Sequence, residues 1–125
     1  MGIIADAAEK AGMKIVILSP MPSCEMANGK FSHPLLAPYA EASRKFAAKK
    51  GYYFIDRYTM LTEYFRDMPE EEIKKHYMFL KPGEYPNWPQ GRYDHLHLTT
   101  KGTVVVWMIR REIDRKIPEL SVLFK

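Results

Sequence analysis

An acid and two imidazoles lie within four positions of one another in GRYDHLHLTT, residues 91–100. Asp94 and His97 are three positions apart, and residues at this spacing in a turn or helical stretch project to the same side. In an acyl-transfer triad, the imidazole takes the proton of the attacking hydroxyl, while the carboxylate fixes its tautomer and stabilises the imidazolium. The spacing therefore predicts that one short segment supplies a general base, His97, together with its orienting acid, Asp94.

Two other interpretations of this stretch stay open. Asp94 could form an Asx turn that caps the following helix, with His97 bonded to a backbone carbonyl. Alternatively, His95 and His97 could share one face of a strand and hold a metal ion, although no third ligand is evident nearby in the sequence. We expect neither a metal site nor a cofactor.

The elements that must position these residues alternate between helix and strand. Helices are predicted where apolar residues recur every three to four positions, and short apolar runs rich in β-branched or aromatic residues predict strands. Helices are expected over 3–11, 35–50, 58–68, 69–79 and 99–117. Strands are expected in KIVILSP (14–20) and YYFID (52–56). The longer connections are a loop with an Asn-Gly turn over 19–34 and a long proline-containing loop over 80–98.

This alternation predicts an α/β fold with a parallel sheet and right-handed crossovers. Only two strands are apparent, whereas sheets of this kind have about five or six. Four consecutive apolar residues in KIVILSP indicate a strand with a neighbour on each side, and YYFID can supply one of them. The chain is therefore expected to be the second half of a larger domain, with an open sheet edge.

Composition excludes several classes of protein. The chain has 125 residues, 46% of them apolar, enough for one domain with a single core. No apolar run is long enough to cross a bilayer, so no membrane partner is expected. The net charge of +4 is spread over several helices, which favours a solvated surface over a nucleic-acid-binding face. No signal peptide is recognisable, which predicts a cytoplasmic protein unless a signal lies on a preceding segment.

Three further side chains are expected to be structural. The single cysteine, Cys24, excludes an internal disulfide and a cysteine-based zinc site. It is expected to be a small buried residue rather than a nucleophile. His33 and His76 are expected to lie on the surface.

From about Ile3 to Glu119, the chain resembles the C-terminal half of an SGNH (GDSL-type) hydrolase, and among these the rhamnogalacturonan acetylesterase-like carbohydrate esterases. The D-x-x-H pattern of that family matches Asp94 and His97, and the resemblance implies that they act as the acid and the general base. The strings that carry it are KIVILSPMP, GKFSHPLLAPYAEASRKFAAKKGYYFID, FLKPGEYPNWPQG and DHLHLTTKG.

The resemblance implies a flavodoxin-like three-layer α/β/α sandwich, of which residues 1–125 would supply the last two strands and their helices. It also implies metal-independent serine ester hydrolysis, with removal of O-acetyl groups from pectin-type carbohydrates. Aromatic residues of the long loop, Tyr85, Trp88 and Tyr93, could then stack on a sugar ring, or they could pack beneath the prolines.

The nucleophile of that family lies in a Gly-Asp-Ser block, and its oxyanion hole adds a Gly and an Asn from two later blocks. None of these blocks occurs in this sequence. None of the serines sits in a strand-to-helix elbow of the required kind; they are Ser19, Ser23, Ser32, Ser43 and Ser121. We therefore expect the isolated chain to be inactive. The alternative is a catalytically inactive half-domain that acts as a binding or assembly module and self-associates through its open sheet edge.

Overall fold

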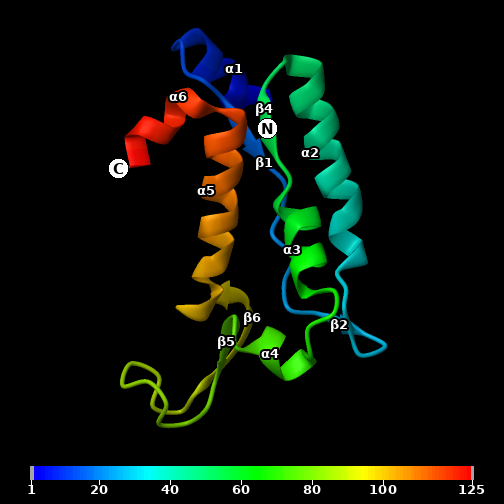
Figure 1. Ribbon diagram of the computed structural model, residues 1–125, viewed down its shortest axis with the longest axis vertical. Coiled ribbons are helices and arrows are strands. Elements are labelled where there is room, and N and C mark those ends of the chain that lie inside the picture. Colours follow the sequence, from blue (N-terminus) through cyan, green and yellow to red (C-terminus); the bar gives the residue numbers. More distant parts are fainter. Residues whose placement is uncertain (1, 125) are drawn as a thin grey trace.

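The computed structural model describes residues 2–124 and has a mixed α/β architecture (Figure 1), so the predicted fold class is confirmed. The helices are α1 (Gly2–Lys10), α2 (Ala37–Lys50), α3 (Arg57–Phe65), α4 (Glu70–Lys74), α5 (Val104–Lys116) and α6 (Pro118–Ser121). The strands are β1 (Val16–Leu18), β2 (Met26–Ala27), β3 (Lys30–Phe31), β4 (Tyr53–Ile55), β5 (Tyr77–Leu80) and β6 (Arg92–Leu98). Short 3₁₀ turns are η1 (Pro34–Leu36), η2 (Lys101–Thr103) and η3 (Val122–Phe124).

A parallel pair of strands forms the centre of the fold. β1 and β4 pair in register from Val16–Tyr53 to Leu18–Ile55, as the sequence predicts for KIVILSP and YYFID. In Figure 1 the pair lies between α2 and α5, and α2 packs on both strands while α5 packs on β4. Within residues 2–124, β1 and β4 pair only with each other, so the outer edges of both strands are open. No helix in this part of the chain is long and apolar enough to cross a membrane.

Two antiparallel hairpins replace segments that were predicted to be loop or helix. The predicted loop over 19–34 contains the β2–β3 hairpin, and its Asn28-Gly29 turn has positive φ at both residues, 52° and 73°. A type I′ turn requires such angles, so the turn itself was predictable. The prediction of helix through 69–79 is wrong beyond Lys74, because residues 77–80 form β5.

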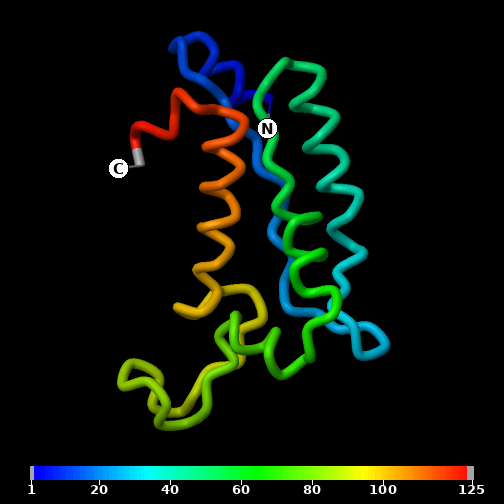
Figure 2. The backbone as a smooth tube through the Cα atoms, in the orientation of Figure 1, coloured from blue at the N-terminus to red at the C-terminus, as the bar shows by residue number. Residues whose placement is uncertain are grey.

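The prediction of loop throughout 80–98 is also wrong, because its last seven residues form β6 and pair with β5. The register jumps within this hairpin: Tyr77 lies opposite Leu98, whereas Met78 lies opposite Asp94. Residues 95–97 therefore form a bulge on β6. Such bulges re-aim side chains and increase the local twist. The connection between the two strands projects from the rest of the chain (Figure 2).

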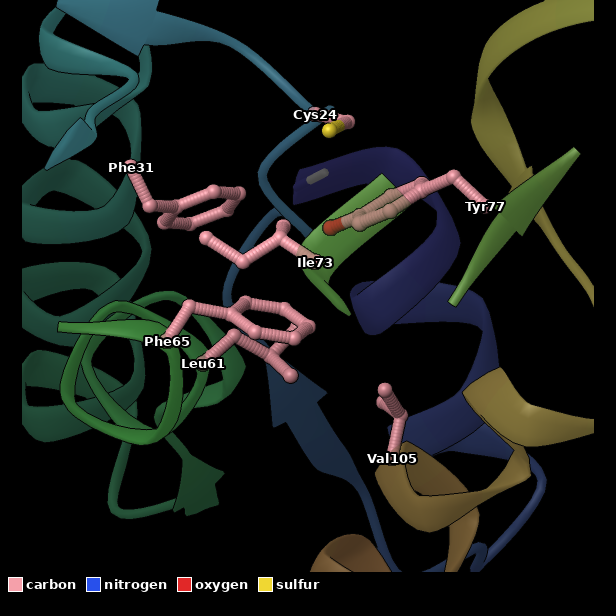
Figure 3. Close-up of a cluster of buried hydrophobic side chains, with 7 residues drawn as sticks. All are labelled: Cys24, Phe31, Leu61, Phe65, Ile73, Tyr77 and Val105. Atoms are coloured by element: carbon pink, nitrogen blue, oxygen red, sulfur yellow. The ribbon is translucent and has the colours of Figure 1, made fainter. Parts of the chain in front are cut away.

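A buried cluster ties the second hairpin to the helices (Figure 3). Its members come from both hairpins, from the segment after β1, and from three helices: Cys24, Phe31, Leu61, Phe65, Ile73, Tyr77 and Val105. The hydroxyl of Tyr77 also donates to the carbonyl of Pro22 at 2.8 Å. His76 is only 1% exposed and packs edge-on against Phe65, which corrects the expectation of a surface histidine. β5 is thus firmly anchored, and β6 is positioned through it.

Candidate active site

The β6 bulge brings Asp94 and His97 into contact. Asp94 Oδ2 lies 2.8 Å from His97 Nδ1, which confirms the contact predicted from the D-x-x-H spacing. The other carboxylate oxygen, Oδ1, accepts the backbone N–H groups of Leu96 and His97, each at 3.0 Å. An Asx turn is therefore present as well, and it orients the acid instead of capping α5, which begins at Val104 without a side-chain cap.

The acid is shielded and the imidazole is accessible. The side chain of Asp94 is 13% exposed, and that of His97 is 66% exposed. With the carboxylate accepting at Nδ1, the neutral ring carries its proton there and presents Nε2 as the basic nitrogen. Nε2 forms no hydrogen bond with residues 2–124. The arrangement can therefore take a proton from a hydroxyl group that approaches from outside the hairpin.

Arg92, which the motif did not point to, also binds this carboxylate. Its Nη2 and Nε donate to Asp94 Oδ2 at 2.7 and 3.1 Å. The pKa of Asp94 is held well below its usual range, first by the backbone N–H of His97 and then by the Arg92 guanidinium. Asp94 therefore stays ionised at neutral pH. The only sequence signal for Arg92 is its position two residues before Asp94, because residues two apart in a strand lie on the same face.

Backbone contacts connect the bulge to the carboxyl end of β1. The N–H of Cys24 donates to the carbonyl of His95 at 2.7 Å, so the segment that follows β1 packs directly along β6. Burial raises the pKa of the Cys24 thiol to about 11, consistent with the predicted small buried residue. At the other end of the hairpin, Gly102 passes so close to the carbonyl of His76 that a Cβ there would lie 2.4 Å from it.

A cleft of about 780 Å³ lies between the hairpin and α4. Tyr85, Tyr93 and Arg92 line it, so two of the three predicted stacking aromatics line the same cleft as the partner of Asp94. Tyr93 is largely exposed and its ring meets Phe79 edge-on, with 4.7 Å between centroids. The remaining cleft residues are Glu71, Lys74, Lys75, Phe79, Leu80, Lys81, Glu84, Gln90, Gly91, Thr99 and Lys101.

Trp88 occupies a different position from the two tyrosines. Its indole lies beneath the Arg92 guanidinium, whose carbon is 4.3 Å from the ring centroid, and it lines a smaller pocket of about 190 Å³ with Tyr85. Trp88 is partly exposed and packs against Arg92, so it is neither a fully free platform for a sugar ring nor a residue buried beneath the prolines. For the histidines, no group of three or more His, Cys, Asp or Glu side chains in residues 2–124 could hold a metal ion.

A second polar cluster was missed in the sequence. Ser23 Oγ lies 2.7 Å from His33 Nδ1, and Glu25 lies 3.3 Å from the same nitrogen. Only 11% of the His33 side chain is exposed, so the expectation that it lies on the surface is wrong. The Asn-Gly hairpin juxtaposes these residues. Because acid and hydroxyl meet the same ring nitrogen, the cluster lacks the order of a triad, in which they occupy opposite nitrogens.

Comparison with known proteins gives one distant similarity. The chain is 27% identical over 105 residues to the rhamnogalacturonan acetylesterase RhgT of Bacillus subtilis (strain 168). The match covers 83% of this chain and 45% of RhgT, so it spans less than half the length of that relative. No family model matches the chain, and no solved structure matches it significantly. The similarity supports a distant relationship to SGNH-like hydrolases and hints at an esterase-like function.

Proposed function

We propose that Asp94 and His97 are the acid and general base of an SGNH-type serine esterase that removes acetyl groups from carbohydrates. The observation that carries the proposal is the 2.8 Å contact between Asp94 Oδ2 and His97 Nδ1, which leaves Nε2 accessible. The distant similarity to RhgT supports acetyl-ester chemistry. The serine nucleophile and oxyanion donors would come from polypeptide outside residues 1–125, because their sequence blocks do not occur here.

In this reaction, Nε2 of His97 takes the proton of the serine hydroxyl as its oxygen attacks the acetyl carbonyl. The tetrahedral intermediate collapses, the C–O bond to the sugar breaks, and the sugar oxygen receives the proton from His97. A water molecule, deprotonated by the same nitrogen, then attacks the acetyl-serine; the bond between the acetyl carbon and the serine oxygen breaks, acetate leaves, and the serine oxygen receives the proton from His97. Asp94, kept ionised by its N–H and Arg92 donors, stabilises the imidazolium in both steps.

The cleft that Arg92, the partner of Asp94, helps to line supports a carbohydrate substrate. Tyr85 and Tyr93 are both partly or largely exposed on its walls, and aromatic faces of this kind stack on sugar rings. A volume of about 780 Å³ is within the range of small-molecule sites, which is about 300–1,000 Å³. The name of RhgT specifies rhamnogalacturonan for that protein. We infer an acetylated pectin-type sugar for the present chain.

A replacement experiment tests this function directly. The full chain takes the place of the 105 matched residues of RhgT, and acetate release is measured on acetylated rhamnogalacturonan and on an aryl acetate. The folded chimera is expected to release acetate, whereas the isolated chain is expected to remain at background because it brings no nucleophile block. Ser23→Ala is the matched control and should leave the chimera active. A folded chimera without acetate release would contradict the proposal.

A second candidate function is assembly with another copy of the chain. The β1–β4 pair has open edges, and large apolar side chains are exposed on α1 and α5, among them Ile3, Ile4 and Trp107. Open strand edges favour pairing between chains. Light scattering during size-exclusion chromatography should then detect a dimer or larger species, and Val16→Lys should abolish ordered association or folding. A stable wild-type monomer with cooperative unfolding would exclude this function.

A further inference from the structure

We propose that Arg92 is a positioning residue that holds the carboxylate of Asp94 toward His97, and that Trp88 keeps the Arg92 guanidinium in place. The inference rests on the proposed role of Asp94 and His97. In this arrangement Trp88 of the long loop acts on His97 through Arg92 and Asp94. Neither residue belongs to the D-x-x-H pattern.

The hydrogen bonds to Asp94 divide between its two oxygens. Oδ1 is held by the N–H groups of Leu96 and His97, which belong to the bulge itself. Oδ2 receives both nitrogens of Arg92 and also faces His97 Nδ1. With donors fixed on either side, the carboxyl group cannot rotate without breaking at least one charge-assisted bond. Arg92 is therefore the contact outside residues 94–97 that fixes which way Oδ2 points.

The guanidinium is itself oriented by the long loop. It lies over the Trp88 indole, at 4.3 Å from the ring centroid, and stacking of this kind favours a flat, fixed Arg side chain. Trp88 itself belongs to a tight turn, in which its backbone N–H donates to the carbonyl of Tyr85 at 2.9 Å. The chain of contacts thus runs from the loop to the indole, the guanidinium, the carboxylate and the imidazole.

The consequence concerns the tautomer of His97. A carboxylate aimed at Nδ1 keeps the proton there and leaves Nε2 able to accept a proton from a hydroxyl group. In a serine protease, loss of this control by the acid reduces kcat about 10⁴-fold although the geometry is intact. Arg92 would therefore act on the reaction without touching the substrate, by maintaining the Nδ1–H form.

Two other cationic side chains that line the cleft pair with glutamates of α4. Lys101 pairs with Glu72 of α4, and Lys74 pairs with Glu70. The segment that packs along β6 carries Glu25, which faces His33. Lys81 lines the same cleft as Arg92 but forms no hydrogen bond or ion pair with Asp94, so Lys81→Gln removes an equal charge from the cleft and serves as the matched control.

Nitrogen-15 NMR of the histidine-labelled full chain tests the proposal without requiring activity. At pH 8.5, above the usual titration range of histidine, the ring nitrogen shifts report the ratio of the Nδ1–H and Nε2–H forms. Arg92→Gln should change that ratio toward Nε2–H by about two- to fivefold, as expected for loss of one partly exposed charged contact. Arg92→Lys should restore part of the change, Trp88→Ala should produce a smaller one, and Lys81→Gln should produce none.

Two results would overturn the proposal: an unchanged tautomer ratio in folded Arg92→Gln, or an equal change in Lys81→Gln. If Arg92→Gln fails to fold, Trp88→Ala decides, and an unchanged ratio in that variant overturns the role of the stacked contact chain. Failure of the proposed function is distinguishable, because it appears as a chimera that releases no acetate while the tautomer ratio still responds to Arg92→Gln.

Discussion

Two aspartates in this molecule hold a side chain of catalytic type by a hydrogen bond. Asp56, directly after β4, accepts from the hydroxyl of Ser19 at 3.0 Å, and Asp94, in the β6 bulge, faces His97 at 2.8 Å. The first pair is closed: Ser19 is 0% exposed, and its oxygen also accepts the N–H of Tyr58. The second pair is open, because most of the His97 ring is exposed.

The difference lies in how the remaining hydrogen-bonding capacity is used. At the carboxyl end of the parallel pair, Asp56 caps α3 through the N–H of Thr59, and Arg57 donates to the carbonyl of Ser19. These hydrogen bonds join β1, β4 and α3. In the bulge, the acid is fully bonded but the imidazole keeps one nitrogen without a protein partner in the described chain. The buried acid–hydroxyl pair therefore offers no free atom to a substrate, whereas the pair in the bulge leaves one imidazole nitrogen accessible.

The largest expected effect is on the open pair. In the RhgT chimera, His97→Gln should lower acetate release by at least about 10³-fold, because the general base is lost while substrate binding remains. His95→Gln is the matched control, since His95 is adjacent and exposed but makes no side-chain contact with Asp94. Equal losses in both variants would show that the bulge has been disrupted and that His97 has no special role.

The closed pair should dominate stability instead. Asp56→Ala should lower the free energy of unfolding by about 2–3 kcal/mol, combining a lost N-cap of about 1 kcal/mol with a buried hydroxyl that loses its acceptor. Asp56→Asn keeps an oxygen at the cap and should recover much of this. Urea denaturation of the isolated chain measures both variants. A larger loss for Asp94→Ala than for Asp56→Ala would reverse the assignment of roles.

A smaller effect is expected in the pH dependence of stability. The pKa of Asp94 is lower in the folded chain than the unfolded value of about 3.9. Its contribution to stability is therefore fully present above about pH 5, and it decreases as the pH falls through about 4, because the unfolded chain binds the proton first. Asp94→Asn should reduce the decrease in the free energy of unfolding between pH 5 and pH 3, and Arg92→Gln should reduce it by a smaller amount. Unchanged slopes in both would contradict the role of these donors.

The central elements were predictable because their signals are local. The apolar stripe of residues 35–50, ended by Gly51 at φ 70°, marked α2, and the β-branched run KIVILSP marked β1. The β5–β6 hairpin was not predictable in this way. Residues 77–80 follow a helix directly, and their strand conformation depends on pairing with β6, whose sequence is rich in polar residues.

Within the candidate site, spacing alone predicted the contact between Asp94 and His97. It did not predict Arg92, because strand residues share a face only once the strand is known to exist. His76 and His33 were misplaced for a related reason. Each is buried by segments distant in sequence: Phe65 and Tyr64 cover His76, and the β2–β3 hairpin folds His33 onto Ser23.

The bulge confines the candidate site to a few consecutive residues. The acid, the imidazole, the two backbone donors and the arginine all lie within residues 92–97, and none depends on the closure of a distant loop. The gain or loss of one residue between Tyr93 and Leu98 would change the bulge and with it the contact between the acid and the imidazole. Because the acid and the imidazole lie in so few consecutive residues of one paired strand, a single insertion or deletion acts on both at once.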